Sequence, residues 1–139
     1  MTIAVHVNYW AILVCGLVSI GLGYLWYNTR IFGRIWMDSV DHSEEEARKN
    51  FKPLKSHGLS FIGHLIMACA LAQVMALANA NTVTEGIRFA FLCWIGFTAT
   101  AMLINNVFEG ESMKRLLVDG GYHLITLLVF GIILGAWSI

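Results

Sequence analysis

Seven polar side chains that are able to bind a proton, a cation or a hydrogen-bonding ligand stand out in an otherwise apolar chain. Imidazoles titrate near neutral pH, carboxylates relay protons or hold cations, and amides and phenols form hydrogen bonds. The candidate polar layer comprises His64, Asn105, Asn106, Glu109, Asp119, Tyr122 and His123. No HxxxH, HExxH or ExxH pattern accompanies these residues, so the sequence names no catalytic, metal or cofactor-binding residue and leaves the cofactor unknown.

These side chains act together only if helices bring them to one depth. His64 lies early in the second of four long apolar runs, His123 lies early in the fourth, and the Asn105, Asn106 and Glu109 group ends the third. At ~1.5 Å per residue, all of them fall within ~10 Å of the same membrane boundary. Polar groups in hydrocarbon turn toward the protein. We therefore expect the layer to face the interior of a bundle.

Three interpretations of the layer remain open. In the first, the side chains only bond across helices, each bond stabilising by ~0.6 kcal/mol on average. In the second, His64 and His123 titrate, and Asp119 and Glu109 relay a proton or hold a cation. In the third, two histidines with carboxylates form a metal or catalytic centre. The first interpretation requires least of the sequence.

Four apolar runs supply the elements that position the layer. They cover residues 9–26, 59–78, 87–107 and 116–137, each close to the ~20 residues that cross a ~30 Å hydrocarbon core as a helix. Since the chain is 58% hydrophobic and only 139 residues long, it has room for one domain, 1–139. The predicted fold is all-α, an integral membrane bundle of four transmembrane helices with a short amphipathic or cytoplasmic helix in the first loop, 27–58.

The basic residues predict the orientation of these spans. Six of the nine Lys and Arg residues lie in the first loop, two lie between the third and fourth runs, and Arg88 is the ninth. Short basic loops stay in the cytoplasm, which places both termini outside. The net charge of zero offers no nucleic-acid surface. We expect the lipid bilayer as the main partner.

The first loop divides into two parts. Arg30, Phe32, Arg34 and Trp36 are expected to anchor an amphipathic helix in the inner interface, with its arginines toward anionic headgroups. A second helix is expected over about 44–51, because Ser43 and Glu46 have capping-box spacing and Pro53 follows. This segment is either a solvated connector or a docking site for a soluble partner.

Small residues predict close helix packing. The candidates are Gly16, Ser19, Gly23, Gly131 and Gly135. Missing side chains let helix backbones approach in lipid, and such contacts serve equally within one bundle or across a homodimer. The three cysteines lie one in each of the first three runs without a CxxC pattern, and we expect them to be core residues. Whether Cys15 contacts Cys93 stays open.

The chain resembles a known family. The segment 8–37, "NYWAILVCGLVSIGLGYLWYNTRIFGRIWM", the loop "SEEEARKNF", and the segment 108–137, "FEGESMKRLLVDGGYHLITLLVFGIILGAW", resemble the bacterial membrane family called domain of unknown function 1761. The "LWYNTRIFGRIW" and "DGGYH" pieces are the most specific. The resemblance implies a four-span membrane fold and a bacterial source, hence the cytoplasmic (inner) membrane, and no assigned activity.

Three functions of different classes are consistent with these residues. The preferred hypothesis is a non-enzymatic module that self-associates as a homo-oligomer or serves as an accessory subunit of a larger membrane complex. One alternative is a small proton-linked transporter or channel that uses the polar layer. A second alternative is a membrane enzyme that binds a lipid or quinone at the inner leaflet.

Overall fold

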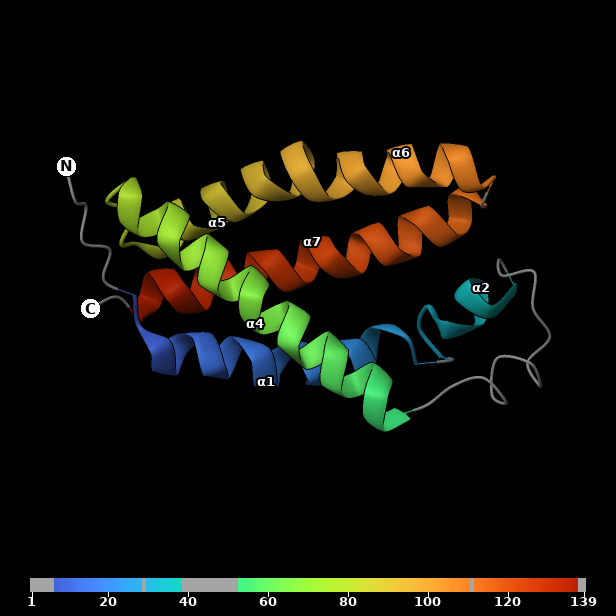
Figure 1. Ribbon diagram of the computed structural model, residues 1–139, viewed down its shortest axis with the longest axis horizontal. Helices are drawn as coiled ribbons and strands as arrows, with labels where there is room; N and C mark the ends of the chain where they lie inside the picture. The colour runs from blue at the N-terminus through green and yellow to red at the C-terminus, as the bar shows by residue number, and fades with distance from the viewer. Residues whose placement is uncertain (1–6, 29, 39–52, 111, 138–139) are drawn as a thin grey trace.

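The computed structural model describes residues 7–28, 30–38, 53–110 and 112–137, and these are helical throughout apart from short connections. Their helices, in chain order, are α1 (Tyr9–Trp26), α2 (Gly33–Asp38), α4 (Pro53–Leu77), α5 (Val83–Cys93), the π-helical η1 (Trp94–Thr98), α6 (Ala99–Glu109) and α7 (Met113–Ala136). Figure 1 shows α5, η1 and α6 as one long rod that runs beside α7. No strand occurs in the described part.

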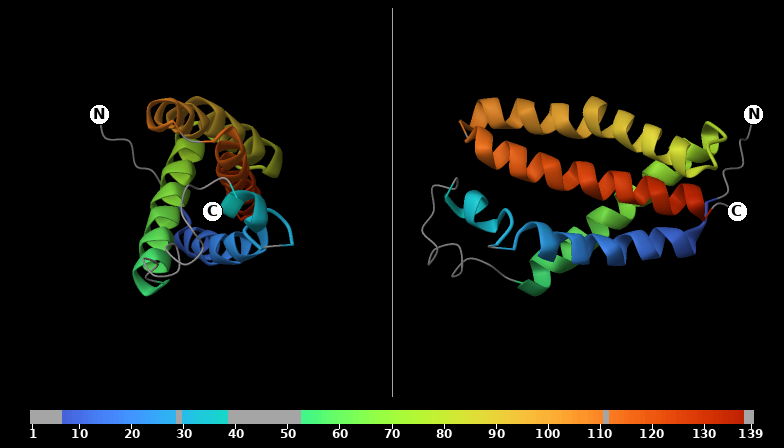
Figure 2. Two further views of the ribbon diagram at one scale, coloured as in Figure 1. Left: turned by 90° about the vertical axis from the view of Figure 1, so that its right-hand side faces the viewer. Right: turned by 180° about the vertical axis from the view of Figure 1, so that it is seen from behind.

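Four helical segments are long and apolar enough to cross a membrane. They are Tyr9–Trp26, Lys55–Leu77, Val83–Glu109 and Met113–Ala136. The predicted all-α, four-span membrane bundle is thereby confirmed. Figures 1 and 2 show that α1, α7 and the α5–α6 rod run roughly alongside one another, whereas α4 crosses the bundle obliquely from α5 toward α1.

A hydrogen bond joins the start of α1 to the end of α7. The Asn8 side chain caps α1 by accepting hydrogen bonds from the backbone N–H groups of Trp10 and Ala11, which satisfies donors that a helix start leaves open. Its amide Nδ2 donates to the Trp137 carbonyl at 3.1 Å. One side chain therefore starts the first span and holds the end of the last.

The helix α4 begins at Pro53, before the expected start of the second span at residue 59. The sequence places Pro53 after the expected loop helix, but proline also suits the first turn of a helix, because the N–H that it lacks would have no hydrogen-bond partner there. The connection from α1 is accordingly shorter than the expected 27–58. The expected helix over 44–51 lies outside the described residues.

The third span is divided by the π-helical turn η1. Thr82 caps its start by accepting from the Glu85 N–H at 3.2 Å, and Gly110, with φ of 67°, ends it in the left-handed conformation. Within it, the Thr100 hydroxyl donates to the Gly96 carbonyl at 2.8 Å. A π-helical turn is a local interruption of the α-helical bonding pattern, and here it separates the part packed on α7 from the more exposed α6.

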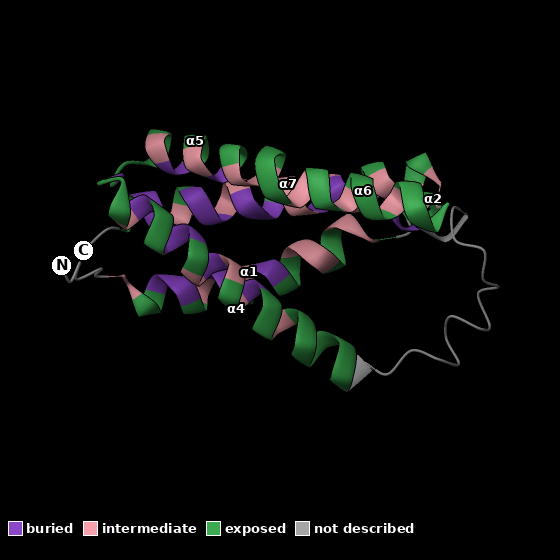
Figure 3. Cartoon of the chain, turned by 45° about the horizontal axis from the view of Figure 1, so that its top comes forward, coloured by how far each residue is buried: buried purple, intermediate pink, exposed green. Residues whose placement is uncertain are grey.

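The core lies between α1, α4, α5 and α7. Its fully buried side chains include Cys15, Ala68, Ala90 and Phe130. Cys93 packs against the same cluster, and all three cysteines are free thiols. Figure 3 shows that the buried surface follows these four helices, while the first half of α4 and much of α6 are exposed.

Glycines set the tightest contact, between α5 and α7. A β-carbon on Gly86 would lie 2.7 Å from the Gly131 carbonyl carbon, one on Gly131 would lie 2.6 Å from that of Gly86, and one on Gly135 would lie 2.7 Å from that of Thr82. The helix backbones therefore touch. Gly131 and Gly135 of α7 therefore both lie against the backbone at the start of the third span within this chain.

Candidate functional site

His64 and Tyr122 form the centre of the buried polar cluster. His64 is the first buried residue of α4 and is 7% exposed. Its Nε2 lies 3.4 Å from the Tyr122 hydroxyl of α7, and its Nδ1 lies 2.8 Å from the Ser60 carbonyl one turn earlier. The Ser60 hydroxyl is 3.3 Å from the same Nδ1. The two helices thus cross at a contact between an imidazole and a phenol.

The helix α1 supplies the third wall of this cluster. The Tyr122 hydroxyl donates to the Ser19 carbonyl at 3.0 Å. Gly23, one turn further along α1, leaves room for the phenol, because a β-carbon there would lie 3.3 Å from the Tyr122 oxygen. Ser19 itself donates to the Gly16 carbonyl at 2.6 Å, and a β-carbon on Gly16 would lie 2.7 Å from Leu65 of α4. The small residues of α1 therefore serve packing within the bundle.

His123 and Thr126 complete the cluster on the same face of α7. The His123 ring lies 5.4 Å from the Tyr122 ring and 6.4 Å from the His64 ring, between centroids. Its Nδ1 and the Thr126 hydroxyl are buried without a hydrogen-bond partner among the described residues. Buried polar atoms normally have partners. This part of the cluster therefore has unused hydrogen-bonding capacity.

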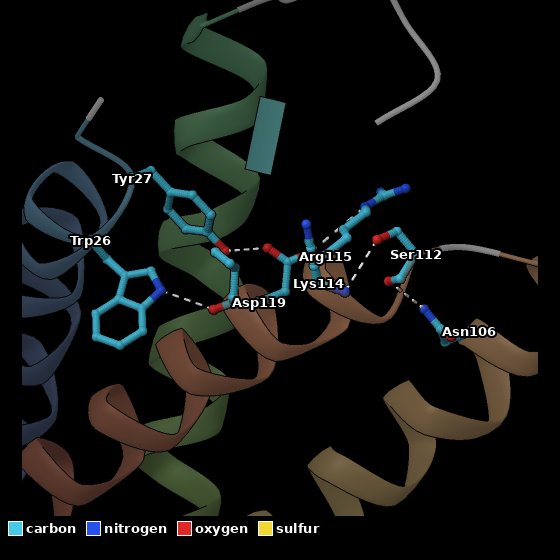
Figure 4. Close-up of polar contacts among 8 residues, drawn as sticks. Trp26, Tyr27, Asn106, Ser112, Lys114, Arg115 and Asp119 are labelled. Carbon is cyan, nitrogen blue, oxygen red and sulfur yellow. Dashed lines mark hydrogen bonds and ion pairs between the residues drawn. The ribbon is translucent and has the colours of Figure 1, made fainter. Parts of the chain in front are cut away.

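Asp119 lies one turn before His123 and belongs to a second contact, shown in Figure 4. The Tyr27 hydroxyl, just after α1, donates to Asp119 Oδ1, and Arg115 Nε lies 3.8 Å from Asp119 Oδ2. Burial raises the pKa of the Tyr27 phenol above its ordinary value, and the hydrogen bond to the Asp119 carboxylate raises it further. The phenol therefore stays neutral and remains a donor.

Two indoles hold the backbone of α7 at the level of this site. Trp26 Nε1 donates to the Val118 carbonyl at 2.9 Å, and Trp94 Nε1 donates to the Gly120 carbonyl at 3.0 Å. Gly121 makes room for the Trp26 ring. Reasoning from the sequence missed Tyr27, Trp26 and Trp94 as contributors. The paired glycines 120 and 121 beside Tyr122 were the one available signal that something approaches α7 closely.

The structure divides the predicted layer. His64, Tyr122 and His123 are brought together, and Asp119 is one turn away. Asn106 donates instead to the Ser112 carbonyl at 3.3 Å, across the turn between α6 and α7 (Figure 4). Asn105 and Glu109 have exposed side chains, not interior ones as expected. The helix α6 buries none of its residues, so Asn105 and Glu109 share the depth of the histidines but do not face them.

The expected interface anchors lie around the short helix α2. Phe32 stacks on Trp26 with ring centroids 4.4 Å apart, so it covers the bundle end and does not point only to acyl chains. Arg30 and Arg34 are exposed, as headgroup contacts require. The Trp36 side chain lies outside the described part of the structure. The helix α2 itself is six residues long.

The geometry sets limits on what the cluster does chemically. In the described part of the chain, no group of three or more His, Cys, Asp and Glu side chains is arranged to hold a metal ion. The described contacts are those of neutral donors and acceptors, with one carboxylate held by Tyr27 and Arg115. Such a cluster suits helix packing or the binding of a proton.

A comparison with known proteins places the chain in a family. No curated protein and no solved structure matches it. A family model described as "Protein of unknown function (DUF1761)" matches residues 10–135. This match includes all of the residues of the polar cluster and nearly all of the four spans. The chain therefore belongs to the family of proteins of unknown function designated DUF1761.

Proposed function

We propose that this protein is a non-enzymatic membrane module that assembles with a second copy of itself through its third span. One observation carries the proposal. Only 6% of the apolar window of Val83–Glu109 is buried within the chain, against 28%, 28% and 39% for the other three spans. The third span packs on α7 and, through α5, also on α4, and most of its remaining surface is available to another protein.

The Asn105 amide favours protein over lipid on this surface. It is exposed and has no hydrogen-bond partner among the described residues, whereas the hydroxyl of Thr100 is satisfied by Gly96 within the helix. An unpaired amide in a membrane span gains from a bond across helices. Because a carboxamide is both donor and acceptor, two copies of Asn105 complement each other across a two-fold axis. This self-complementarity favours a second copy as the partner.

The glycines of α7 and α1 already make contacts within the chain, which leaves α6 as the expected site of contact between two copies. Gly131 and Gly135 of α7 already lie against α5, so a dimer through that motif would have to displace α5. Gly16 and Gly23 of α1 likewise lie against α4 and α7. The exposed large side chains of the third span, which include Phe97, Ile104 and Phe108, supply the packing area around Asn105.

We place the module in the cytoplasmic membrane of a bacterium, with both termini outside. The bond between Asn8 and the Trp137 carbonyl supports a common side for the two ends. The basic residues Arg30, Arg34, Lys114 and Arg115 gather in segments at the opposite ends of the spans, as cytoplasmic loops require. Accessibility of single cysteines at residues 8 and 30 to an impermeant thiol reagent, in a background without Cys15, Cys69 and Cys93, tests this orientation.

The assembly is tested by single-molecule photobleaching of labelled protein in liposomes over a series of protein-to-lipid ratios. We expect the wild type to show two-step bleaching. Asn105→Leu should weaken the dimer by roughly tenfold, which corresponds to the ~1–2 kcal/mol that such a bond contributes in model peptides. Gln73→Leu is the matched control, because Gln73 is an exposed amide on α4 whose Nε2 already donates to Cys69 Sγ at 3.3 Å.

Two results would contradict this function. A wild type that stays monomeric at every protein-to-lipid ratio would exclude self-association. Equal losses of dimer in Asn105→Leu and Gln73→Leu would show that the third span is not the contact.

A further inference from the structure

The hydrogen bonds of His64 determine which ring nitrogen carries its proton. Nδ1 lies 2.8 Å from the Ser60 carbonyl oxygen, which can only accept. Were Nδ1 unprotonated, two lone pairs would face each other at this distance. The Ser60 hydroxyl, at 3.3 Å, is the more distant neighbour. The neutral imidazole is therefore the Nδ1–H form, and Nε2 carries a lone pair directed toward Tyr122.

The Tyr122 hydroxyl then has one proton for two acceptors. One acceptor is the Ser19 carbonyl at 3.0 Å, and the other is His64 Nε2 at 3.4 Å. Since the shorter contact takes the proton, Nε2 is left without a donor in a buried position. His64 Nε2 and the phenol oxygen face each other as two acceptors, which is unfavourable where water is absent.

We propose that His64 is a proton-binding site of this membrane domain, completed by the Tyr122 oxygen and the Ser60 carbonyl. One added proton satisfies the whole chain of contacts. The imidazolium donates from Nδ1 to Ser60 and from Nε2 to Tyr122, while Tyr122 continues to donate to Ser19. The proton comes from water and no bond between heavy atoms changes.

The groups that face His64 from each neighbouring helix influence its protonation. From α7, His64 is faced by Tyr122, by His123 with ring centroids 6.4 Å apart, and by the apolar Phe130 ring. Asp119 lies one turn beyond His123 and is held by Tyr27 and Arg115. From α1, the neighbour is the Ser19 carbonyl, and on α4 itself the next titratable group is His57, whose ring contacts Tyr24. Two imidazoles so close together titrate as a coupled pair, in which the first bound proton opposes the second.

This inference is independent of the proposed dimer, since His64 and Tyr122 lie on α4 and α7 and not on the third span. The test uses the full chain, labelled with ¹⁵N-histidine, in lipid nanodiscs. Imidazole ¹⁵N signals distinguish the Nδ1–H form, the Nε2–H form and the imidazolium. The His64 signal is identified by its loss in His64→Gln.

We expect His64 to be in the Nδ1–H form at high pH and to become an imidazolium as the pH is lowered. Tyr122→Phe removes the oxygen that accepts from Nε2–H and should lower the midpoint of this transition by roughly one pH unit. Tyr24→Phe removes an exposed phenol that does not contact His64 and should leave the midpoint unchanged.

Several outcomes would overturn the proposal. A neutral wild type in the Nε2–H form would show that the hydrogen-bond assignment is wrong, and this measurement does not depend on any variant folding. A His64 ring that stays neutral down to about pH 4, or a midpoint that is the same in wild type and a folded Tyr122→Phe, would show that the cluster only packs helices.

Discussion

Tyr27 donates a hydrogen bond to the carboxylate of Asp119, and this contact joins the end of α1 to the first turns of α7. Residues 27 and 119 are far apart in the sequence, and Arg115 lies against the other carboxylate oxygen. The indole of Trp26, next to Tyr27, bonds the α7 backbone beside Asp119. Two consecutive aromatic residues thus fix the C-terminal end of the first span to the last span.

The first prediction is that Tyr27→Phe destabilises the domain. The variant keeps the ring and loses the donor to Asp119, so we expect the free energy of unfolding to fall by about 1 kcal/mol, the scale of a hydrogen bond between membrane helices. Thermal unfolding in a mild detergent provides the measurement. Tyr24→Phe, at an exposed tyrosine in the last turn of α1, is the control, and equal losses in the two variants would contradict the assignment.

The second prediction concerns alkaline pH. The folded-state pKa of Tyr27 lies above its ordinary value, first because of burial and second because of the bond to Asp119. A raised folded-state pKa means that the unfolded chain loses the proton first. The stabilisation is therefore complete below about pH 10, the pKa of an unperturbed tyrosine, and is lost as the pH rises toward the folded-state value.

Unfolding measured from about pH 8 to 11.5 tests this sign. The free energy of unfolding of the wild type should decline above about pH 10 more steeply than that of Tyr27→Phe. The difference between the two proteins isolates the contribution of Tyr27 from those of the other three tyrosines. Parallel curves would show that the Tyr27 phenol titrates alike in the folded and unfolded states.

The third prediction is that the contact between α5 and α7 does not tolerate a methyl group. Gly131→Ala places a β-carbon against the Gly86 backbone, and backbone cannot move aside as a side chain does. We expect a loss of about 2–3 kcal/mol, as for other overpacked sites. Gly63→Ala is the matched control, because a β-carbon there meets nothing within 4 Å, and it should be neutral or stabilising by up to about 1 kcal/mol. Urea-dependent unfolding in detergent distinguishes the two.

The fourth prediction separates the two roles of Asn8. Asn8→Ala removes the cap of α1 and the bond to Trp137, and should cost about 1–2 kcal/mol. Asn8→Asp keeps a side-chain oxygen for the cap and loses only the donor to Trp137, so its loss should be smaller. Thermal unfolding of the three proteins gives the comparison, and a larger loss in Asn8→Asp than in Asn8→Ala would contradict this division.

Several features of the fold could be predicted because they depend on composition along the chain. Continuous apolar runs have one stable arrangement in lipid, the helix, since every backbone group must be satisfied within its own segment. The prediction of four spans followed from this constraint and is confirmed. The start of α4 at Pro53 differs from the expected span, because the limit of an apolar run does not mark the limit of a helix.

The polar cluster could be predicted only in part. Helical rise alone places His64 and His123 at a common depth, and the structure brings their rings to 6.4 Å. The same reasoning put Asn105 and Glu109 beside them, but both are exposed. The depth of a residue follows from counting along the helix, whereas its direction depends on which face the helix turns to its neighbours, and α6 buries none of its residues.

The sequence by itself determined that this chain forms four membrane-spanning helices, because burying polar backbone in lipid leaves no other choice for its apolar runs. Only the tertiary structure decided which polar groups meet. The bonds of Tyr27 to Asp119, of Tyr122 to Ser19 and of Trp94 to Gly120 join residues distant in the chain. Which groups meet depends on how whole helices rotate and cross, and no local sequence pattern encodes this. The close glycine contacts between α5 and α7 are one determinant of that arrangement.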